Sequence, residues 1–157
     1  MPDHPEHLSK RLLEEGQKAL AYFSNLPESQ RELTVYSDGS QWNIRQILAH
    51  FVDAEESFTL LIEDVLQGGS GVPEDFNINV YNEKHVARMR DIPYDKLLSR
   101  FKQSRERNAE IVSTITLEDL DRQGRHPFLG MAALGDMIKL IYRHNQIHLR
   151  DIRHLTE

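Results

Sequence analysis

Apolar residues recur every three or four positions in four long stretches of the chain. These stretches run from about Glu6 to Asn25, from Gln41 to Gln67, from Tyr94 to about Thr114, and from about Ala132 to His154. A period of 3.6 residues places such side chains on one face of an α-helix, where they can pack against other helices. The pattern therefore predicts four long amphipathic helices.

The residues that flank the first two stretches are typical of helix ends. Pro27 lies just beyond the first stretch, where a helix cannot easily continue. Ser40 comes before the second stretch and is expected to be its N-cap. Gly68 and Gly69 follow that stretch and tolerate the left-handed conformation of a C-cap.

The connections complete the expected fold. A polar segment, residues 70–79, precedes a shorter helical pattern from Val80 to Arg90, and Thr116–Gly130 is expected to form a turn, a short helix and a loop. No segment shows the clear alternation of apolar and polar residues that is typical of a strand. We expect an all-α structure, a four-helix bundle with a short extra helix in the middle crossing, as a single domain over residues 1–157.

Composition excludes several classes of protein. Apolar residues make up 39% of the chain and charged residues 28%, the balance of a folded globular protein. The net charge of −6 disfavours nucleic acid as a partner, and the absence of any long apolar run excludes a membrane span. The chain has no cysteine, and Met1–Glu6 lacks the features of a signal peptide, so we expect a cytoplasmic protein.

Two histidines on the fourth predicted helix are candidate metal ligands. His144 and His148 are four residues apart, so their Cβ atoms lie about 5–6 Å apart on one helix face. Both interrupt the apolar stripe that contains Met137 and Ile141, which points them into the bundle. Buried imidazoles need hydrogen bonds or a ligand, and two at this spacing can share one ion at about 2.0–2.1 Å.

His50 on the second predicted helix is a candidate third ligand, since it lies at the edge of that helix's inward face. Three histidines would leave an open coordination position on the ion. The alternative is that each is an ordinary core histidine. Asp151, seven residues after His144, is about 10.5 Å along the helix from it and is expected to act indirectly or to lie on the surface.

Other polar residues are expected near the site in supporting positions. Asp53, one turn after His50, is a candidate to orient an imidazole, or else a solvated carboxylate. Ser104 and Asn108 interrupt the stripe of the third helix and either face the cavity or mark a thin part of the core. His85 and His126 lie close to loops, and we expect surface positions for both.

Three motifs follow one another along the chain. They are Trp42–His50, then the Asn-bearing segment Phe76–Asn82, and then His126–Gly130, which leads to His144 and His148. In this order and spacing they resemble the DinB-like superfamily of metalloenzymes, whose second helix is led by a Trp and ends in a ligand His. The resemblance covers nearly the whole chain.

This resemblance implies a four-helix bundle with an up-down-down-up arrangement. It implies a divalent metal, zinc or nickel among others, on three histidines that match His50, His144 and His148. It also favours a homodimer, as does the apolar surface of the first two helices. Family members of known activity include S-transferases that use bacillithiol and an isomerase that uses mycothiol, both of them external low-molecular-weight thiols.

The leading functional hypothesis is a divalent-metal-dependent S-transferase that activates a thiol for attack on a small-molecule substrate. Because the chain has no cysteine, that thiol would have to come from outside. The alternatives are a hydrolase that uses metal-bound hydroxide, and a non-catalytic module that binds a small molecule. The sequence does not separate these three, and it assigns no catalytic residue.

Overall fold

The computed structural model describes residues 3–157; Met1 and Pro2, which belong to the expected domain range, lie outside the described residues. The chain is mostly helical, with one short hairpin of strands. In chain order the elements are α1 (Pro5–Asn25), η1 (Glu28–Gln30), α2 (Ile44–Leu66), α3 (Ile78–Arg88), α4 (Tyr94–Thr114), η2 (Glu118–Asp121), β1 (Gln123–His126), β2 (Gly130–Ala133) and α5 (Leu134–Thr156).

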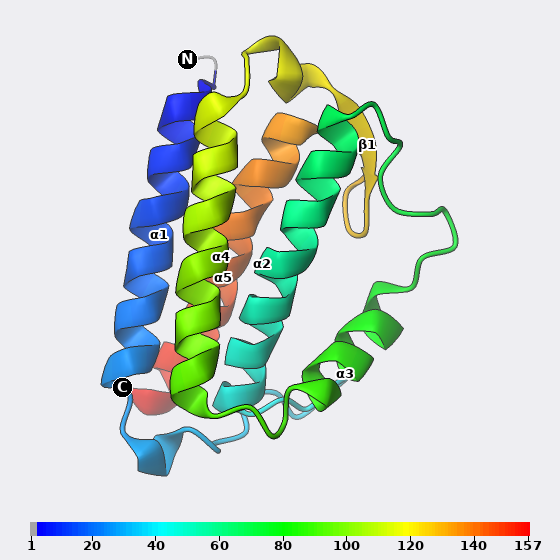
Figure 1. Ribbon diagram of the computed structural model, residues 1–157. Helices are drawn as coiled ribbons and strands as arrows, with labels where there is room; N and C mark the ends of the chain where they lie inside the picture. Colours follow the sequence, from blue (N-terminus) through cyan, green and yellow to red (C-terminus); the bar gives the residue numbers. More distant parts are fainter. Residues whose placement is uncertain (1–2) are drawn as a thin grey trace.

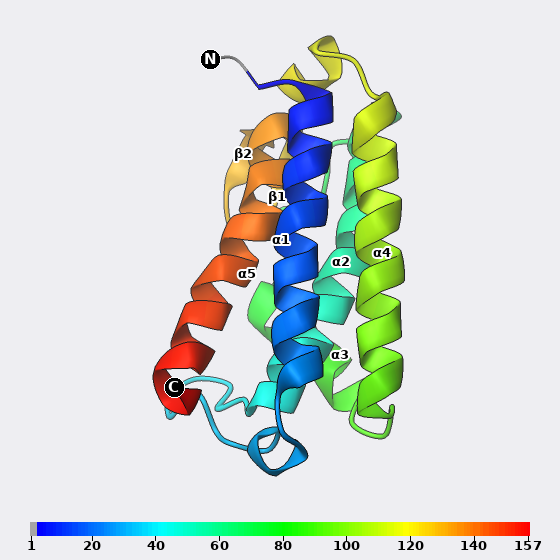
Figure 2. The same cartoon turned by 90° about the vertical axis from the view of Figure 1, so that its left-hand side faces the viewer.

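Four long helices form a bundle (Figure 1). Helices α2 and α4 run in one direction, and α1 and α5 run in the other. Both α1 and α2 pack against α4 and α5, and Figure 2 shows α1 flanked by these two helices. The order of directions confirms the expected up-down-down-up bundle, with α3 as the short extra helix of the middle crossing.

The parallel direction of α2 and α4 determines where α3 lies. Because α2 ends at the opposite end of the bundle from the start of α4, the chain must return along the full length of the helices. Residues 67–93 make this return, and α3 packs on the outer side of α2 within it.

Within residues 3–157 no helix is both long and apolar enough to cross a membrane.

The hairpin is a difference from the expected fold. Residues 116–130 were expected to contain no strand, but β1 pairs with β2 in antiparallel register, Gln123 opposite Ala133. Each strand has four residues, too few for an alternating pattern to stand out from the sequence. The hairpin also joins the α2–α3 connection, where Gly71 has a φ of +87° and a Cβ would lie 2.4 Å from the Arg125 nitrogen.

Helix α2 begins later than the sequence suggested, and with a different cap. Asn43, not Ser40, is the N-cap: its Oδ1 accepts from the Gln46 backbone nitrogen over 2.8 Å. The Gln46 side chain accepts in turn from the Asn43 backbone nitrogen over 2.9 Å, which completes a capping box. At the other end Gly68 has a φ of +89°, so the expected left-handed glycine after α2 is confirmed.

The buried apolar residues form two cores, separated by a polar layer. The first core packs around the start of α2 and includes Phe23, Phe51 and Phe101. The second packs around its end and includes Ile62 and Met137. The polar layer between them consists of Glu55 and Thr59 on α2, Arg105 and Asn108 on α4, and Asn145 on α5.

The capping box of α2 generates a stability prediction. Asn43→Ala removes the acceptor for the Gln46 nitrogen, and the loss of an N-cap costs about 1 kcal/mol. We expect the urea midpoint to fall accordingly with no change in m-value. Asn43→Ser restores an N-cap oxygen and should recover most of the loss; equal destabilisation by both variants would contradict the capping role.

Candidate metal centre and cavity

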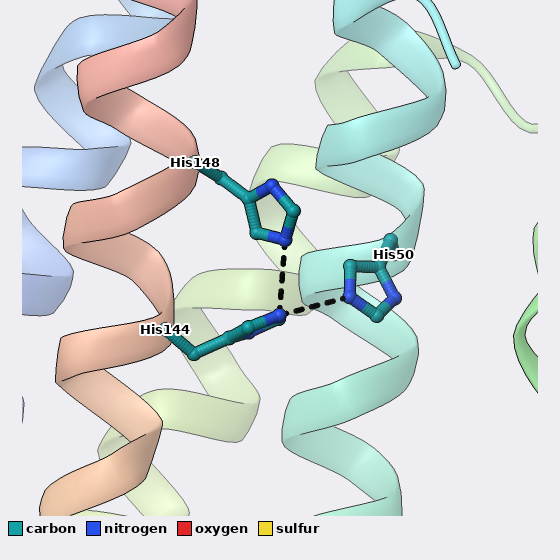
Figure 3. A group of neighbouring side chains, drawn as sticks. All are labelled: His50, His144 and His148. Carbon is teal, nitrogen blue, oxygen red and sulfur yellow. Dashed lines mark hydrogen bonds between the residues drawn. The ribbon is translucent and has the colours of Figure 1, made fainter. Parts of the chain in front are cut away.

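Three imidazoles converge between α2 and α5 (Figure 3). The His144 Nε2 lies 3.3 Å from the His50 Nε2 and 3.0 Å from the His148 Nε2. One nitrogen from each ring lies within 4.8 Å of the other two. The structure therefore brings together the three histidines that the sequence predicts as ligands.

Helix geometry explains why these rings meet. His144 and His148 lie one turn apart on α5, and α2 packs against that face of α5 with His50 turned toward it. Aromatic neighbours hold the rings in place: the Trp42 ring lies 4.8 Å from the His50 ring, and the Phe51 ring lies 5.8 Å from the His148 ring, centroid to centroid.

The spacing of the nitrogens fits a shared divalent ion. A metal at about 2.0–2.1 Å from two imidazole nitrogens, at angles of about 90–110°, holds those nitrogens about 2.9–3.4 Å apart. Both Nε2–Nε2 distances from His144, 3.3 and 3.0 Å, fall in this range. Three imidazoles are a donor set that suits zinc and nickel, and they leave coordination positions free.

The surroundings keep all three rings neutral, as metal ligation requires. Burial lowers the pKa of His50 well below its usual value, with His144 and His148 adding to the effect. Burial, assisted by His148 and His126, lowers the pKa of His144 to about 3. Burial also lowers the pKa of His148. At neutral pH each ring therefore has one nitrogen with a free lone pair.

A residue from the α1–α2 connection orients His148. The Tyr36 hydroxyl donates to the Asp151 Oδ2 over 2.7 Å and lies 2.7 Å from the His148 Nδ1. Burial and Asp151 raise the pKa of Tyr36, so its hydroxyl keeps its proton. Because that proton goes to the carboxylate, the His148 Nδ1 must donate to the hydroxyl oxygen. The lone pair of His148 is thereby on Nε2, which faces the other two rings.

A cavity of about 620 Å³ opens beside the three histidines. His50 and His144 line it, together with side chains from the second half of α2, from α3, from the β1–β2 turn and from α5. The size is in the range of pockets that hold small molecules. The three-histidine cluster therefore lies at the wall of a space that can hold a ligand.

Asp53 lines the same cavity and contacts the imidazole of His85, which is not one of the three candidate ligands. Its Oδ1 accepts from the His85 Nδ1 over 2.7 Å, and the His85 ring stacks on Tyr81 with centroids 3.8 Å apart. The Tyr81 hydroxyl lies 2.7 Å from the Ser57 hydroxyl. Burial raises the pKa of Asp53, against the opposing effect of His85.

The polar layer forms the back of the cavity. Glu55 lines it and accepts from the Arg105 Nη2 over 2.6 Å, and Arg105 also donates to the Leu12 carbonyl and to Asn145. Asn108 donates to Glu55 over 3.0 Å. Asn108 therefore supports a cavity residue from behind, without lining the cavity.

Of the two positions expected for Ser104, the structure does not show the cavity lining: Ser104 is half-buried on α4. One other expectation differs from the structure. His126 was expected on the surface, but it is buried and lines the cavity, where its Nδ1 accepts from the Phe128 and Leu129 backbone nitrogens over 3.0 and 3.3 Å. The expectation failed because a hairpin of two four-residue strands, which shows no pattern in the sequence, folds this loop over α2 and α5.

Comparison with known proteins identifies the family of this chain. The model of the DinB superfamily matches residues 11–152. A relative from Oceanobacillus iheyensis, provisionally named a metal-dependent hydrolase, is 25% identical over 126 residues, which are 79% of this chain and 70% of the relative.

Two solved structures share the fold. YfiT from Bacillus subtilis, described as a four-helix bundle of unusual topology and provisionally as a metal-dependent hydrolase, aligns with a TM-score of 0.78 and 18% identity. That alignment covers 97% of this chain and 85% of YfiT. The colibactin self-resistance protein ClbS, solved with a double-stranded DNA, aligns with a TM-score of 0.73 and 15% identity over 98% of this chain and 97% of ClbS.

The neutral, buried imidazoles predict a pH dependence of stability in the metal-free protein. Unfolded histidines take up protons below about pH 6.5, whereas His50, His144 and His148 resist protonation while folded. The unfolded state therefore binds more protons, and the free energy of unfolding should fall as the pH decreases from 7.5 to 5.5. Urea unfolding in the presence of a chelator measures this slope.

Two histidine variants, one as the test and one as its control, show whether the buried cluster causes this slope. His144→Gln removes one resistant imidazole and should flatten the slope, whereas His154→Gln changes an exposed side chain at the end of α5 and should leave the slope as it is. A slope that is unaffected by His144→Gln would contradict the account of the buried cluster.

Proposed function

The chain belongs to the DinB superfamily, and from this premise we propose that it is a divalent-metal-dependent enzyme acting on a small molecule in the cavity. The observation that carries the proposal is the convergence of three neutral imidazoles at the wall of a space of about 620 Å³. His50, His144 and His148 would hold the ion, with zinc and nickel the best matches to three nitrogen donors.

A bound ion would supply Lewis-acid chemistry: it lowers the pKa of a coordinated water or thiol and so provides a nucleophile near neutral pH. Three neutral donors suit this role because they leave the positive charge of the ion uncompensated. Tyr36 would hold His148 in the tautomer that directs its Nε2 lone pair to the centre.

Asp53 is the residue best placed to accept a proton from the nucleophile. It lies one helical turn from His50, lines the same cavity, and is held through its Oδ1 by His85, so that its Oδ2 would be available to a ligand. Burial raises the pKa of Asp53, so its carboxylate holds a proton more readily than a solvated one. We propose that Asp53 is the general base and that His85 positions it.

Hydrolysis is the reaction that these observations support best. The Oceanobacillus relative and YfiT both have names that place them with metal-dependent hydrolases, and a cavity carboxylate can take the proton of an attacking water. Thiol S-transfer is the second candidate, supported by the same uncompensated charge, which favours a thiolate. Turnover with bacillithiol, glutathione or coenzyme A and an electrophile would distinguish S-transfer from hydrolysis, and absence of any turnover would favour a binding module.

Nucleic acid is not a partner in this proposal. ClbS was solved with a double-stranded DNA, but at 15% identity it shares only the fold with this chain. The net charge of −6 opposes binding to a polyanion.

Two further expectations from the sequence stay predictions: a single domain over residues 1–157, and a cytoplasmic location.

The metal proposal predicts the effect of a single ligand change. The purified protein should bind one divalent ion, and His148→Ala should abolish stoichiometric binding because two imidazoles hold an ion far less tightly than three. The helical circular dichroism should change little, since most of the core lies elsewhere. Isothermal titration with zinc and nickel measures the stoichiometry.

The matched control is His154→Ala, which removes an exposed imidazole from the same helix. This variant should bind one ion with the affinity of the unchanged protein. Stoichiometric binding by His148→Ala, or the absence of binding by the unchanged protein at neutral pH, would contradict the proposed site.

The role of Asp53 predicts a loss of rate without a loss of metal. Asp53→Asn keeps the shape and the His85 contact but cannot accept a proton, and loss of a general base costs about 10²–10⁴ in kcat. We expect this decrease with p-nitrophenyl butyrate as a model ester and one ion still bound. Asp64→Asn, which neutralises another cavity carboxylate more than two turns further along α2, should keep kcat within about threefold.

A homodimer remains the proposed oligomeric state. Leu13 on α1 is a large apolar side chain that is exposed outside the cavity, and burial of such residues favours association. Light scattering at micromolar concentration should give twice the mass of the 157-residue chain. A monomer under these conditions would contradict the proposal.

A further inference from the structure

The walls of the cavity are mostly apolar. Besides His50, His144 and the polar groups already described, the lining comes from large aliphatic and aromatic side chains on α2, α3, α5 and the hairpin turn; those that form the walls include Phe58, Leu61, Phe76, Ile78, Leu140 and Ile141. Such walls stabilise a ligand in proportion to the apolar area that it removes from water. A ligand that fills this space must therefore present an apolar body.

The mouth of the cavity is also apolar. Leu60, Phe128, Leu129 and Ile147 all line it, and between 43% and 69% of each residue is exposed to solvent. They come from α2, the β1–β2 turn and α5, so they surround one opening. The His126 Nδ1 accepts hydrogen bonds from the Phe128 and Leu129 backbone nitrogens. These bonds stabilise the turn that places the two side chains at the mouth.

The charged side chains that line the cavity, considered apart from an ion on the three histidines, have one sign. Among the lining residues that the structure describes there are three acidic side chains, Asp53, Glu55 and Asp64, and no lysine or arginine. Glu55 is neutralised from behind by Arg105, which does not line the cavity. Asp53 and Asp64 remain to repel an anion and attract a cation.

The shape of this surface favours a small molecule over a second copy of the chain. The apolar residues of the mouth lead into a concave space of about 620 Å³, which a convex protein surface would leave empty, whereas pockets of this volume hold small ligands. The three-histidine cluster lies at the wall of the same space, so a ligand there would be in reach of it.

We propose that the cavity selects a substrate with an extended apolar body that is uncharged or cationic, and that it rejects anionic groups along that body, away from the ion that the three histidines would hold. This inference rests on the proposed function and names its substrate class. It has a consequence for the choice of nucleophile: thiols that carry several carboxylates or phosphates are poorly matched to a space without a basic side chain. Water, or an uncharged small thiol, meets no such barrier.

The test uses the full-length protein and alkyl probes of graded length and charge. Butyl, hexyl and octyl alcohols, amines and carboxylates are titrated against the chelator-treated protein by calorimetry. Affinity should rise about three- to fourfold for each added methylene, the gain expected from burying that group. Octylamine and octanol should bind at least about tenfold more tightly than octanoate.

Paired variants locate the binding. Leu60→Gln should weaken octanol several-fold, whereas Leu155→Gln, which changes another exposed helical leucine outside the cavity lining, should leave binding unchanged. Asp53→Asn should weaken octylamine about fivefold with no effect on octanol, because only the cation loses an attraction. Equal affinity for octanoate and octanol, an affinity independent of chain length, or equal effects of the two leucine variants would overturn the proposal.

The chain-length series is repeated with the metal-loaded protein to separate this proposal from the proposed enzyme activity. If no metal binds, the series in the chelator-treated protein still tests the cavity by itself. If one ion binds and the model ester is hydrolysed, but affinity shows no dependence on chain length in either form, the substrate class is wrong and the metal-dependent activity stands.

Discussion

Three imidazoles share one interior position in this bundle only if all of them are neutral, and much of the structure follows from that requirement. A protonated ring beside two others in a buried space would be repelled by its neighbours and would lose its hydration. Burial lowers the pKa of all three histidines, and Tyr36 with Asp151 selects the tautomer of His148. The same arrangement that avoids charge leaves lone pairs directed at a common point.

The direction of the helices explains the cavity, the second part of the site. An ordinary antiparallel bundle needs only short turns, but parallel α2 and α4 require a connection as long as the helices. Residues 67–93 form that connection, and the hairpin joins it through the close approach of Gly71 to Arg125. The cavity therefore lies between the bundle and a wall made of its own crossing, which explains why a histidine cluster on two bundle helices opens onto a ligand-sized space.

The parts of the structure that the sequence predicted depend on local periodicity. Helical period gave the four long helices and α3, and the spacing of four residues brought His144 and His148 onto one face. His50 followed from its place on the inward face of α2. The identity of the cap of α2 was missed because Ser40 and Asn43 are both good N-cap residues, and only the capping box with Gln46 favours the second.

The parts that the sequence did not predict depend on pairings between distant segments. Tyr36 lies in a connection without periodic pattern, 112 residues before the histidine that it orients. The partners of Asp53 and Glu55 lie on α3 and α4, 32 and 50 residues away. The burial of Asn145 and His126 was not predicted. Asn145 lies between the two candidate ligands of α5, which drew attention away from it, and His126 lies in a loop, where no periodic pattern indicates burial. The pattern of apolar residues along a chain predicts which helix faces are buried, but it does not predict which polar side chains form hydrogen bonds with one another.

The distribution of the three histidines along the chain bears on the order of events during synthesis. His50 is made early, but His144 and His148 lie on α5, 94 and 98 residues later and on the last helix of the bundle. A nascent chain that has completed only α1, α2 and α4 holds a single member of the cluster, too few to retain a divalent ion. Metal capture would thus wait until the last helix has been made, and loading with the ion would mark chains whose folding has reached its final step.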